Sequence, residues 1–132
     1  VKIKEKNNLS RYGVLDVEPV EKNIYKIKKI VEKPDPKDAP SDLAALGAYI
    51  LLPEIFDVIK KLNPGKGGEI WLVDAINELI KRGFPVYACE INQGKYYDTG
   101  NKLEYMKTVT EFALTHPDIS KDFKKYLKSL GL

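Results

Sequence analysis

The chain has 132 residues, of which 43% are hydrophobic and 31% charged, and its formal net charge is +3. This length and composition suit one globular domain with a single core. The small net charge argues against a nucleic-acid-binding protein, which normally carries a concentrated basic stripe, and no apolar run is long enough to span a bilayer. The one cysteine, Cys89, excludes an intrachain disulfide framework and predicts a buried thiol in a cytoplasmic protein.

The chain opens with VKIKEKNN and has no initiating methionine. Apolar or acidic residues at positions 1, 3 and 5 alternate with lysines, as they would in a strand that is entered midway. We therefore expect a fragment of a longer protein or a processed product.

Two strands are predicted in the first quarter of the chain. RYGVLDVEPV, at 11–20, and IYKIKKIVE, at 24–32, are rich in β-forming residues, and 21–23 is a plausible turn. The alternation of the second strand breaks at Lys28 and Lys29, which predicts a β-bulge there.

A third strand is predicted after the proline-rich loop at 33–42. LAALGAYILL, Leu43 to Leu52, has the continuous apolar character of a buried strand. Gly47 within it marks a point where a ligand or another backbone could approach closely.

The rest of the chain alternates helical patterns with one more strand. We expect a helix after Pro53, one with Val73, Ile76, Leu79 and Ile80 on one face, a strand at 86–91, a helix from Gly100 or Asn101 to His116, and a last helix capped by Ser120. Strands followed by alternating helices and strands predict an α/β or α+β layered structure.

Two opposite charges, Glu32 and Lys33, follow the second strand directly. Neighbouring strand residues point to opposite faces, so the two side chains are not expected to neutralise each other. One interpretation is a solvated surface pair. In the other, the strand ends at a cleft, where Glu32 accepts hydrogen bonds from sugar hydroxyls and Lys33 contacts a phosphate.

Asp98 lies in YYDTG, just before the expected third long helix. Its carboxylate could cap that helix. It could also bind magnesium, which often takes only one or two carboxylates and completes its octahedron with phosphate oxygens and water. The metal role would require a partner carboxylate and a nucleotide.

Five motifs occur in one order along the chain: SRYGVLD, IVEKP, APSDLAALGAYIL, GGEIWLVDAI and YYDTGNKLEYM. Together they resemble the bacterial and archaeal UTP–glucose-1-phosphate uridylyltransferases (UDP-glucose pyrophosphorylases), a branch of the sugar-phosphate nucleotidyltransferases. Each motif is weak alone, but five in register are highly specific. DTGNKLEYM favours the uridylyl branch over the thymidylyl branch.

The resemblance implies a role for each of five residues. Gly13 would offer its backbone to a sugar hydroxyl, and Glu32 would bind sugar hydroxyls. Lys33 would bind the sugar phosphate and act in catalysis. Ala45 would line the sugar pocket, and Asp98 would be a catalytic ligand of Mg²⁺.

The same resemblance implies an α/β fold in which residues 1–132 form the sugar-phosphate-binding, C-terminal half of a Rossmann-like domain, a mixed sheet with flanking helices. The family's glycine-rich nucleotide loop and its second metal-binding aspartate precede the region matched here. The chain alone is therefore expected to be inactive.

The implied activity of the whole enzyme is transfer of a uridylyl group from UTP to glucose 1-phosphate, which gives UDP-glucose and diphosphate with Mg²⁺ as cofactor. A homo-oligomer in the cytoplasm is implied, with no nucleic-acid or membrane partner. The alternatives are a thymidylyltransferase, another hexose-1-phosphate nucleotidyltransferase, or a non-catalytic module that binds sugar phosphates or forms oligomers.

Overall fold

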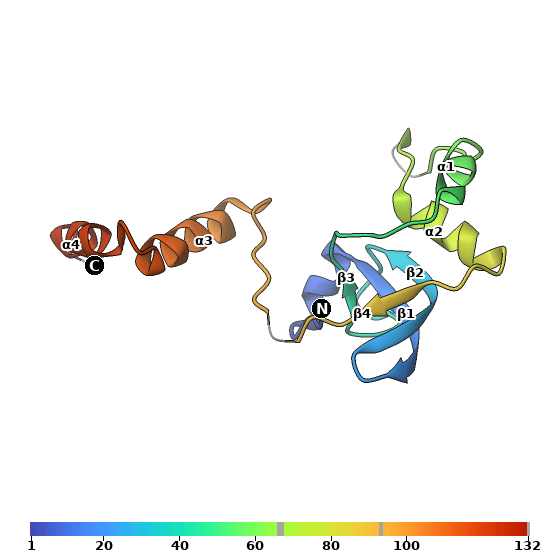
Figure 1. The fold of residues 1–132 in the computed structure, drawn as a ribbon, viewed down its shortest axis with the longest axis horizontal. Helices are drawn as coiled ribbons and strands as arrows, with labels where there is room; N and C mark the ends of the chain where they lie inside the picture. The colour runs from blue at the N-terminus through green and yellow to red at the C-terminus, as the bar shows by residue number, and fades with distance from the viewer. Residues whose placement is uncertain (66–67, 93, 132) are drawn as a thin grey trace. The chain divides into compact units, whose positions relative to one another are not determined.

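The structure, a computed structural model, describes residues 1–65, 68–92 and 94–131. Gly67, in the GGEIWLVDAI motif, lies outside the described residues. The chain divides into two compact units, Val1–Gln93 and Gly94–Leu132. Figure 1 traces their elements from the N-terminus to the C-terminus.

A four-stranded sheet forms the first unit, preceded by a 3₁₀ helix, η1 (Lys6–Arg11). The strands are β1 (Gly13–Glu21), β2 (Ile24–Glu32), β3 (Ala44–Ala45) and β4 (Tyr87–Cys89), in the order β3-β1-β2-β4. The expected α/β class is confirmed. The resemblance implies a mixed sheet, whereas every strand pair formed by the described residues is antiparallel.

The expected β-bulge is present in β2. Asp16 pairs with Lys29 and Val17 pairs with Ile27, so Lys28 has no opposite residue. An extra residue reverses the side-chain alternation of a strand. For this reason Ile27 and Ile30, three positions apart, are both buried on the core side, at 6% and 2% exposure.

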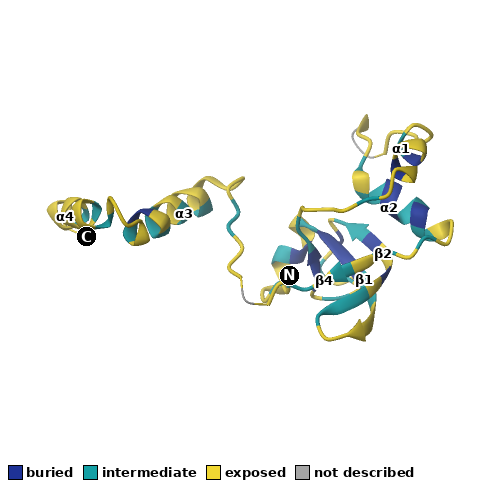
Figure 2. Cartoon of the chain, in the orientation of Figure 1, coloured by how far each residue is buried: buried dark blue, intermediate teal, exposed yellow. Residues whose placement is uncertain are grey.

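Two helices, α1 (Glu54–Ile59) and α2 (Leu72–Lys81), pack with the sheet to form the core. α2 contacts both α1 and β2 (Figure 1). Figure 2 shows that the buried residues gather where the sheet meets these helices. The core consists of Leu15, Ile27, Ile30, Leu43, Ile55, Val58, Ala75, Ile76 and Leu79.

The prediction of a strand over Leu43–Leu52 is wrong for most of its length, since only Ala44–Ala45 form β3. β3 lies between β1 and the first residues of the chain, where Lys2 bridges to Leu43. Beyond β3, no strand among the described residues pairs with the segment, and Ile50 is fully exposed. A backbone without a neighbouring strand cannot form a ladder, whatever its composition.

Cys89 is exposed, which corrects the expectation of a buried thiol. It lies on β4, at the edge of the sheet. Along β4 the half-buried residue is Ala88, and the alternation of the strand places Tyr87 and Cys89 on the opposite, exposed side.

The second unit contains α3 (Lys102–Thr115) and α4 (Ser120–Ser129), which contact each other. Ala113 is the one buried residue among 94–131, and Figure 2 shows most of both helices as exposed or intermediate. Ile119, and not Ser120, is the N-cap residue of α4, and no side chain caps that helix. In the part of the chain that the structure describes, no helix has the length and apolar character that crossing a membrane requires.

Candidate functional site

The register of the sheet aligns three of the residues selected from the sequence. Gly13, the first residue of β1, is opposite Glu32 of β2 on one side and opposite Ala45 of β3 on the other. Residues that are directly opposite in antiparallel strands share one face of the sheet. The three residues therefore form a row on one face, although the sequence separates them by 13 to 32 positions.

The absence of a side chain at Gly13 shapes this row. A Cβ built there would lie 2.9 Å from Glu32 Oε2, 3.2 Å from Ile30 Cγ2 and 3.8 Å from Val73 Cγ2. The carboxylate of Glu32 thus occupies the space that any other residue at position 13 would fill. Gly13 itself is buried, and Glu32 is half-buried.

Lys33 follows Glu32 in an unusual backbone conformation, with φ at +46°. Its N–H donates a hydrogen bond to Tyr12 O at 3.0 Å, and the residue is exposed. Left-handed φ is uncommon for residues other than glycine, and such positions occur often at functional sites. The row of Gly13, Glu32 and Ala45 together with Lys33 is called the sheet-end site below.

Tyr49 is a residue of this region that sequence reasoning missed. It is 42% exposed, in the segment expected to be a buried strand. Partial burial and, secondly, the negative charge of Glu32 raise the pKa of the Tyr49 phenol above its ordinary value. A tyrosine in an apolar run is an ordinary strand residue, so the sequence carried no signal of this proximity.

An open cavity of about 400 Å³ lies beside β3 in the first unit. Its walls include residues 44–51 and 86–91. Ala45 and Tyr49 line it, whereas Gly13, Glu32 and Lys33 are outside its lining. The cavity and the sheet-end site therefore adjoin at Ala45.

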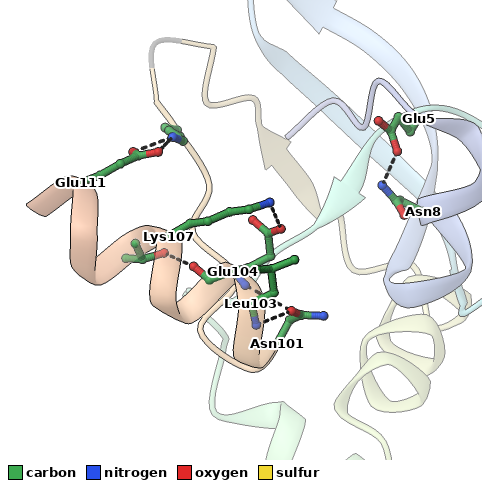
Figure 3. Close-up of polar contacts among 9 residues, drawn as sticks. Glu5, Asn8, Asn101, Leu103, Glu104, Lys107 and Glu111 are labelled. Atoms are coloured by element: carbon green, nitrogen blue, oxygen red, sulfur yellow. Dashed lines mark hydrogen bonds and ion pairs between the residues drawn. The ribbon is translucent and has the colours of Figure 1, made fainter. Parts of the chain in front are cut away.

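Asp98 belongs to the second unit. Its Oδ1 accepts a hydrogen bond from Gly100 N–H at 3.1 Å, and the residue is half-buried. The helix cap that Asp98 could have supplied comes instead from Asn101, whose Oδ1 accepts hydrogen bonds from the N–H groups of Leu103 and Glu104 (Figure 3). Asp98 is thus not the capping residue of α3.

The segment before Asp98 is attached to α3 through Glu111. The Lys95 ammonium forms an ion pair with the carboxylate of Glu111, and Tyr97 O–H donates to Glu111 Oε2 at 3.2 Å. The ring of Tyr97 also lies 5.2 Å from that of Phe112, centroid to centroid. Figure 3 shows Glu111 extending from α3 toward this segment.

These contacts shift two pKa values. The hydrogen bond from Lys95 is the main cause that lowers the pKa of the Glu111 carboxyl, and the same bond raises the pKa of Lys95. Both groups are accordingly charged near neutral pH.

The described residues do not form a complete metal site on their own. They contain no group of three or more histidine, cysteine, aspartate or glutamate side chains that could hold a metal ion. Asp98 offers a single hard carboxylate, which suits one ligand position of Mg²⁺ when phosphate oxygens and water supply the others. Within its own unit Asp98 therefore fits as one ligand of such a site and does not form a complete one.

Relatives of the chain are similar to it along most of its length. It is 45% identical over 125 residues to UTP–glucose-1-phosphate uridylyltransferase of Streptococcus pyogenes, a match that covers 94% of this chain and 40% of that protein. The chain thus spans about two fifths of the length of the curated relatives that it matches.

Solved structures give the same result for the fold. A UDP-glucose pyrophosphorylase complexed with UDP-glucose is 38% identical, with a TM-score of 0.78, over 84% of this chain and 41% of that one. A UTP-bound enzyme from Acinetobacter baumannii is 31% identical, with a TM-score of 0.77, over 96% of this chain and 42% of that one.

The family model described as nucleotidyl transferase matches residues 1–114. This match includes the sheet-end site, α1, α2, Asp98 and most of α3. The resemblance seen in the sequence motifs is confirmed, and the chain belongs to the nucleotidyl transferase family.

Proposed function

We propose that this chain supplies the sugar-phosphate-binding part of an enzyme that transfers a uridylyl group from UTP to glucose 1-phosphate. The observation that supports this most strongly is the sheet-end site, which brings Gly13, Glu32 and Ala45 into one row with Lys33 beside it. The relatives are enzymes of this activity, and one is solved with UDP-glucose.

The side chains of the site divide the recognition of a sugar phosphate between two charges. The carboxylate of Glu32 is an acceptor for sugar hydroxyls, and Gly13, which has no Cβ, leaves room for this carboxylate beside β1. The ammonium of Lys33 is a compact positive charge for the phosphate. Ala45, small and half-buried, lines the side of the site that adjoins the cavity.

The reaction we propose is an in-line displacement at phosphorus. An oxygen of the sugar phosphate attacks the α-phosphorus of UTP, a new P–O bond forms, and the bond to the departing diphosphate breaks. No covalent intermediate with the protein is needed. Lys33 holds the attacking phosphate in position, so its contribution is orientation and charge neutralisation.

Asp98 is proposed as one ligand of Mg²⁺, in line with its carboxylate chemistry. When bound, the metal neutralises charge on the phosphate oxygens. The hydrogen bond to Gly100 and the attachment of Lys95 and Tyr97 to Glu111 restrict the position of Asp98.

We further propose a cytoplasmic homo-oligomer. Exposed apolar side chains along α3 offer a surface that a second copy could cover, among them Leu103, Met106, Val109 and Phe112. Light scattering over a range of concentrations measures this association. The single cysteine is in keeping with a reducing compartment.

Calorimetric titration of the chain tests the proposed function. Glucose 1-phosphate is expected to bind, and glucose or inorganic phosphate alone much more weakly, because each engages only one of the two charged groups. Glu32→Gln should weaken binding of glucose 1-phosphate by about tenfold or more, since hydrogen bonds to charged groups contribute about 1.5–3 kcal/mol. Lys61→Ala, at an exposed residue outside the site, is the matched control.

Equal affinity for glucose 1-phosphate in the Glu32→Gln variant would contradict the proposal. The unaltered chain, supplied with UTP, glucose 1-phosphate and Mg²⁺, should form no UDP-glucose at an enzyme-like rate, since it spans only about two fifths of the length of the relatives with this activity. Rapid formation of UDP-glucose would show that this chain contains the whole catalytic machinery.

A further inference from the structure

We infer that Asn77 is a positioning residue of the sheet-end site: its amide side chain holds the end of β2 from which Glu32 and Lys33 project. The role of those two residues rests on the proposed function. The placement of Asn77 rests on contacts within the first unit alone.

Asn77 lies on α2 and is half-buried. Its Oδ1 accepts a hydrogen bond from Ile30 N–H at 2.8 Å, and its Nδ2 donates to Ile30 O, also at 2.8 Å. One side-chain amide thus forms hydrogen bonds with both the N–H and the C=O group of a single strand residue. This is the pairing that a neighbouring strand would normally supply.

The outer edge of β2 explains why such a contact is needed. β4 pairs with residues 24–26 of β2, and Ile27 N–H donates to Val86 O at 2.8 Å. Further along β2, no strand among the described residues continues this pairing. Without Asn77, the backbone groups of Ile30 would be partly buried and unpaired, which is unfavourable.

Ile30 connects this contact to the site. Its side chain is 2% exposed, and its Cγ2 lies 3.2 Å from the position that a Cβ of Gly13 would take. Glu32 Oε2 lies 2.9 Å from the same position. Ile30 and Glu32 therefore both approach Gly13, and a displacement of β2 at Ile30 would move the carboxylate of Glu32.

Lys33 is tied to the same end of β2. The hydrogen bond from its N–H to Tyr12 O fixes the bend at which φ becomes positive. The pairs of Val31 with Val14 and of Glu32 with Gly13 lie between Ile30 and this bond, so a separation of β2 from α2 at Ile30 would reach Lys33 through them. Asn77 thus controls the positions of both charged groups without being part of the sheet-end site.

Two substitutions distinguish a positioning role of Asn77 from a general contribution to the stability of the fold. Asn77→Ala removes both hydrogen bonds, and Asn77→Asp keeps the shape and the acceptor but loses the donor to Ile30 O. Lys81→Ala is the control, because Lys81 lies one turn further along α2 with its side chain 76% exposed. If Asn77→Ala does not fold, Asn77→Asp is the variant to measure.

The first measurement is amide hydrogen exchange by NMR, which does not require a ligand. In Asn77→Ala we expect the amides of Ile30 and Lys33 to exchange about tenfold faster or more, with little change at the β2–β4 pairs. Asn77→Asp keeps the acceptor for Ile30 N–H and loses only the donor to Ile30 O, so the increase should be smaller there. The second measurement is titration with glucose 1-phosphate, for which we expect an affinity reduced by about tenfold, because misplaced groups bind poorly. Lys81→Ala should change neither.

Unchanged exchange at Ile30 and Lys33, or an equal increase over the whole sheet, would overturn the inference, since Asn77 would then have no role or only a general one. Unchanged affinity together with faster local exchange would also overturn it. If the unaltered chain binds no glucose 1-phosphate, the proposed function fails instead. The exchange data then still decide whether Asn77 holds the end of β2.

Discussion

Lys33 combines an amine suited to a phosphate with a backbone conformation suited to glycine. Its φ of +46° is unfavourable for a residue with a Cβ, by roughly 1–2 kcal/mol. Its N–H is nevertheless held by Tyr12 O. A lysine in a conformation where glycine would be more stable is strained, and strain of this kind is found at functional sites.

This combination predicts opposite effects for one substitution. Lys33→Gly should leave the free energy of unfolding unchanged or raise it by about 1 kcal/mol, because it relieves the strain. It should also weaken binding of glucose 1-phosphate by about tenfold or more, because a charge-assisted contact is lost. Thermal unfolding and calorimetry measure the two effects, and Lys33→Ala, which loses the amine but keeps the Cβ and its strain, is the control. Unchanged affinity in both variants would make Lys33 an ordinary surface residue.

For single residues, the sequence predicted some properties and not others. Glu32 and Lys33 were identifiable from their position at a strand end and from the IVEKP motif. The positive φ of Lys33 and the approach of the Glu32 carboxylate to Gly13 depend on contacts with other strands. For Asp98 the sequence left capping and metal binding open, and the side chain of Asn101 takes the capping role.

Among the elements, the attachment of residues 95–97 to α3 depends on charge. Because the pKa of Glu111 is lowered, its carboxylate stabilises the contact at pH values above 4.5, which is the ordinary pKa of the group. This contribution is lost as the pH falls through the lowered pKa. Because the pKa of Lys95 is raised, its ammonium stabilises the contact at pH values below 10.5, the ordinary pKa of the group, and this contribution is lost as the pH rises through the raised pKa.

We therefore predict an intact contact across the whole neutral range, and its loss only in acid below 4.5 or in strong base above 10.5. NMR titration of the Glu111 carboxyl carbon should give a midpoint below 4.5, and Lys95→Ala should move that midpoint upward. The Tyr97 ring signals should shift over the same pH range. An identical Glu111 midpoint with and without Lys95 would contradict the ion pair.

The elements also show which patterns the sequence determines. The bulge in β2 was predictable because the alternation of apolar residues breaks at Lys28 and Lys29. The extent of the third strand was not, because a strand needs a neighbour and the pairing of Leu43–Leu52 stops at Ala45. The contact of Asn77 with Ile30 joins residues 47 positions apart. The helical pattern around Asn77 gave no indication of this contact.

For the molecule as a whole, five short motifs in order were enough to predict the family, which the match over residues 1–114 confirms. The antiparallel pairing of the sheet and the exposure of Cys89 were not predicted. Both depend on how the strands pair in the sheet, which long-range contacts determine. The row of Gly13, Glu32 and Ala45 likewise exists only once β1, β2 and β3 are in register.

The central claim is that this row, with Lys33, binds a sugar phosphate. NMR chemical-shift mapping of the ¹⁵N-labelled chain during titration with glucose 1-phosphate tests it most directly. We predict saturable shifts at the amides of Gly13, Glu32, Lys33 and Ala45, with little change on α4, and a loss of these shifts in Lys33→Ala. Absence of shifts at these four amides, or shifts that persist unaltered in Lys33→Ala, would contradict the account.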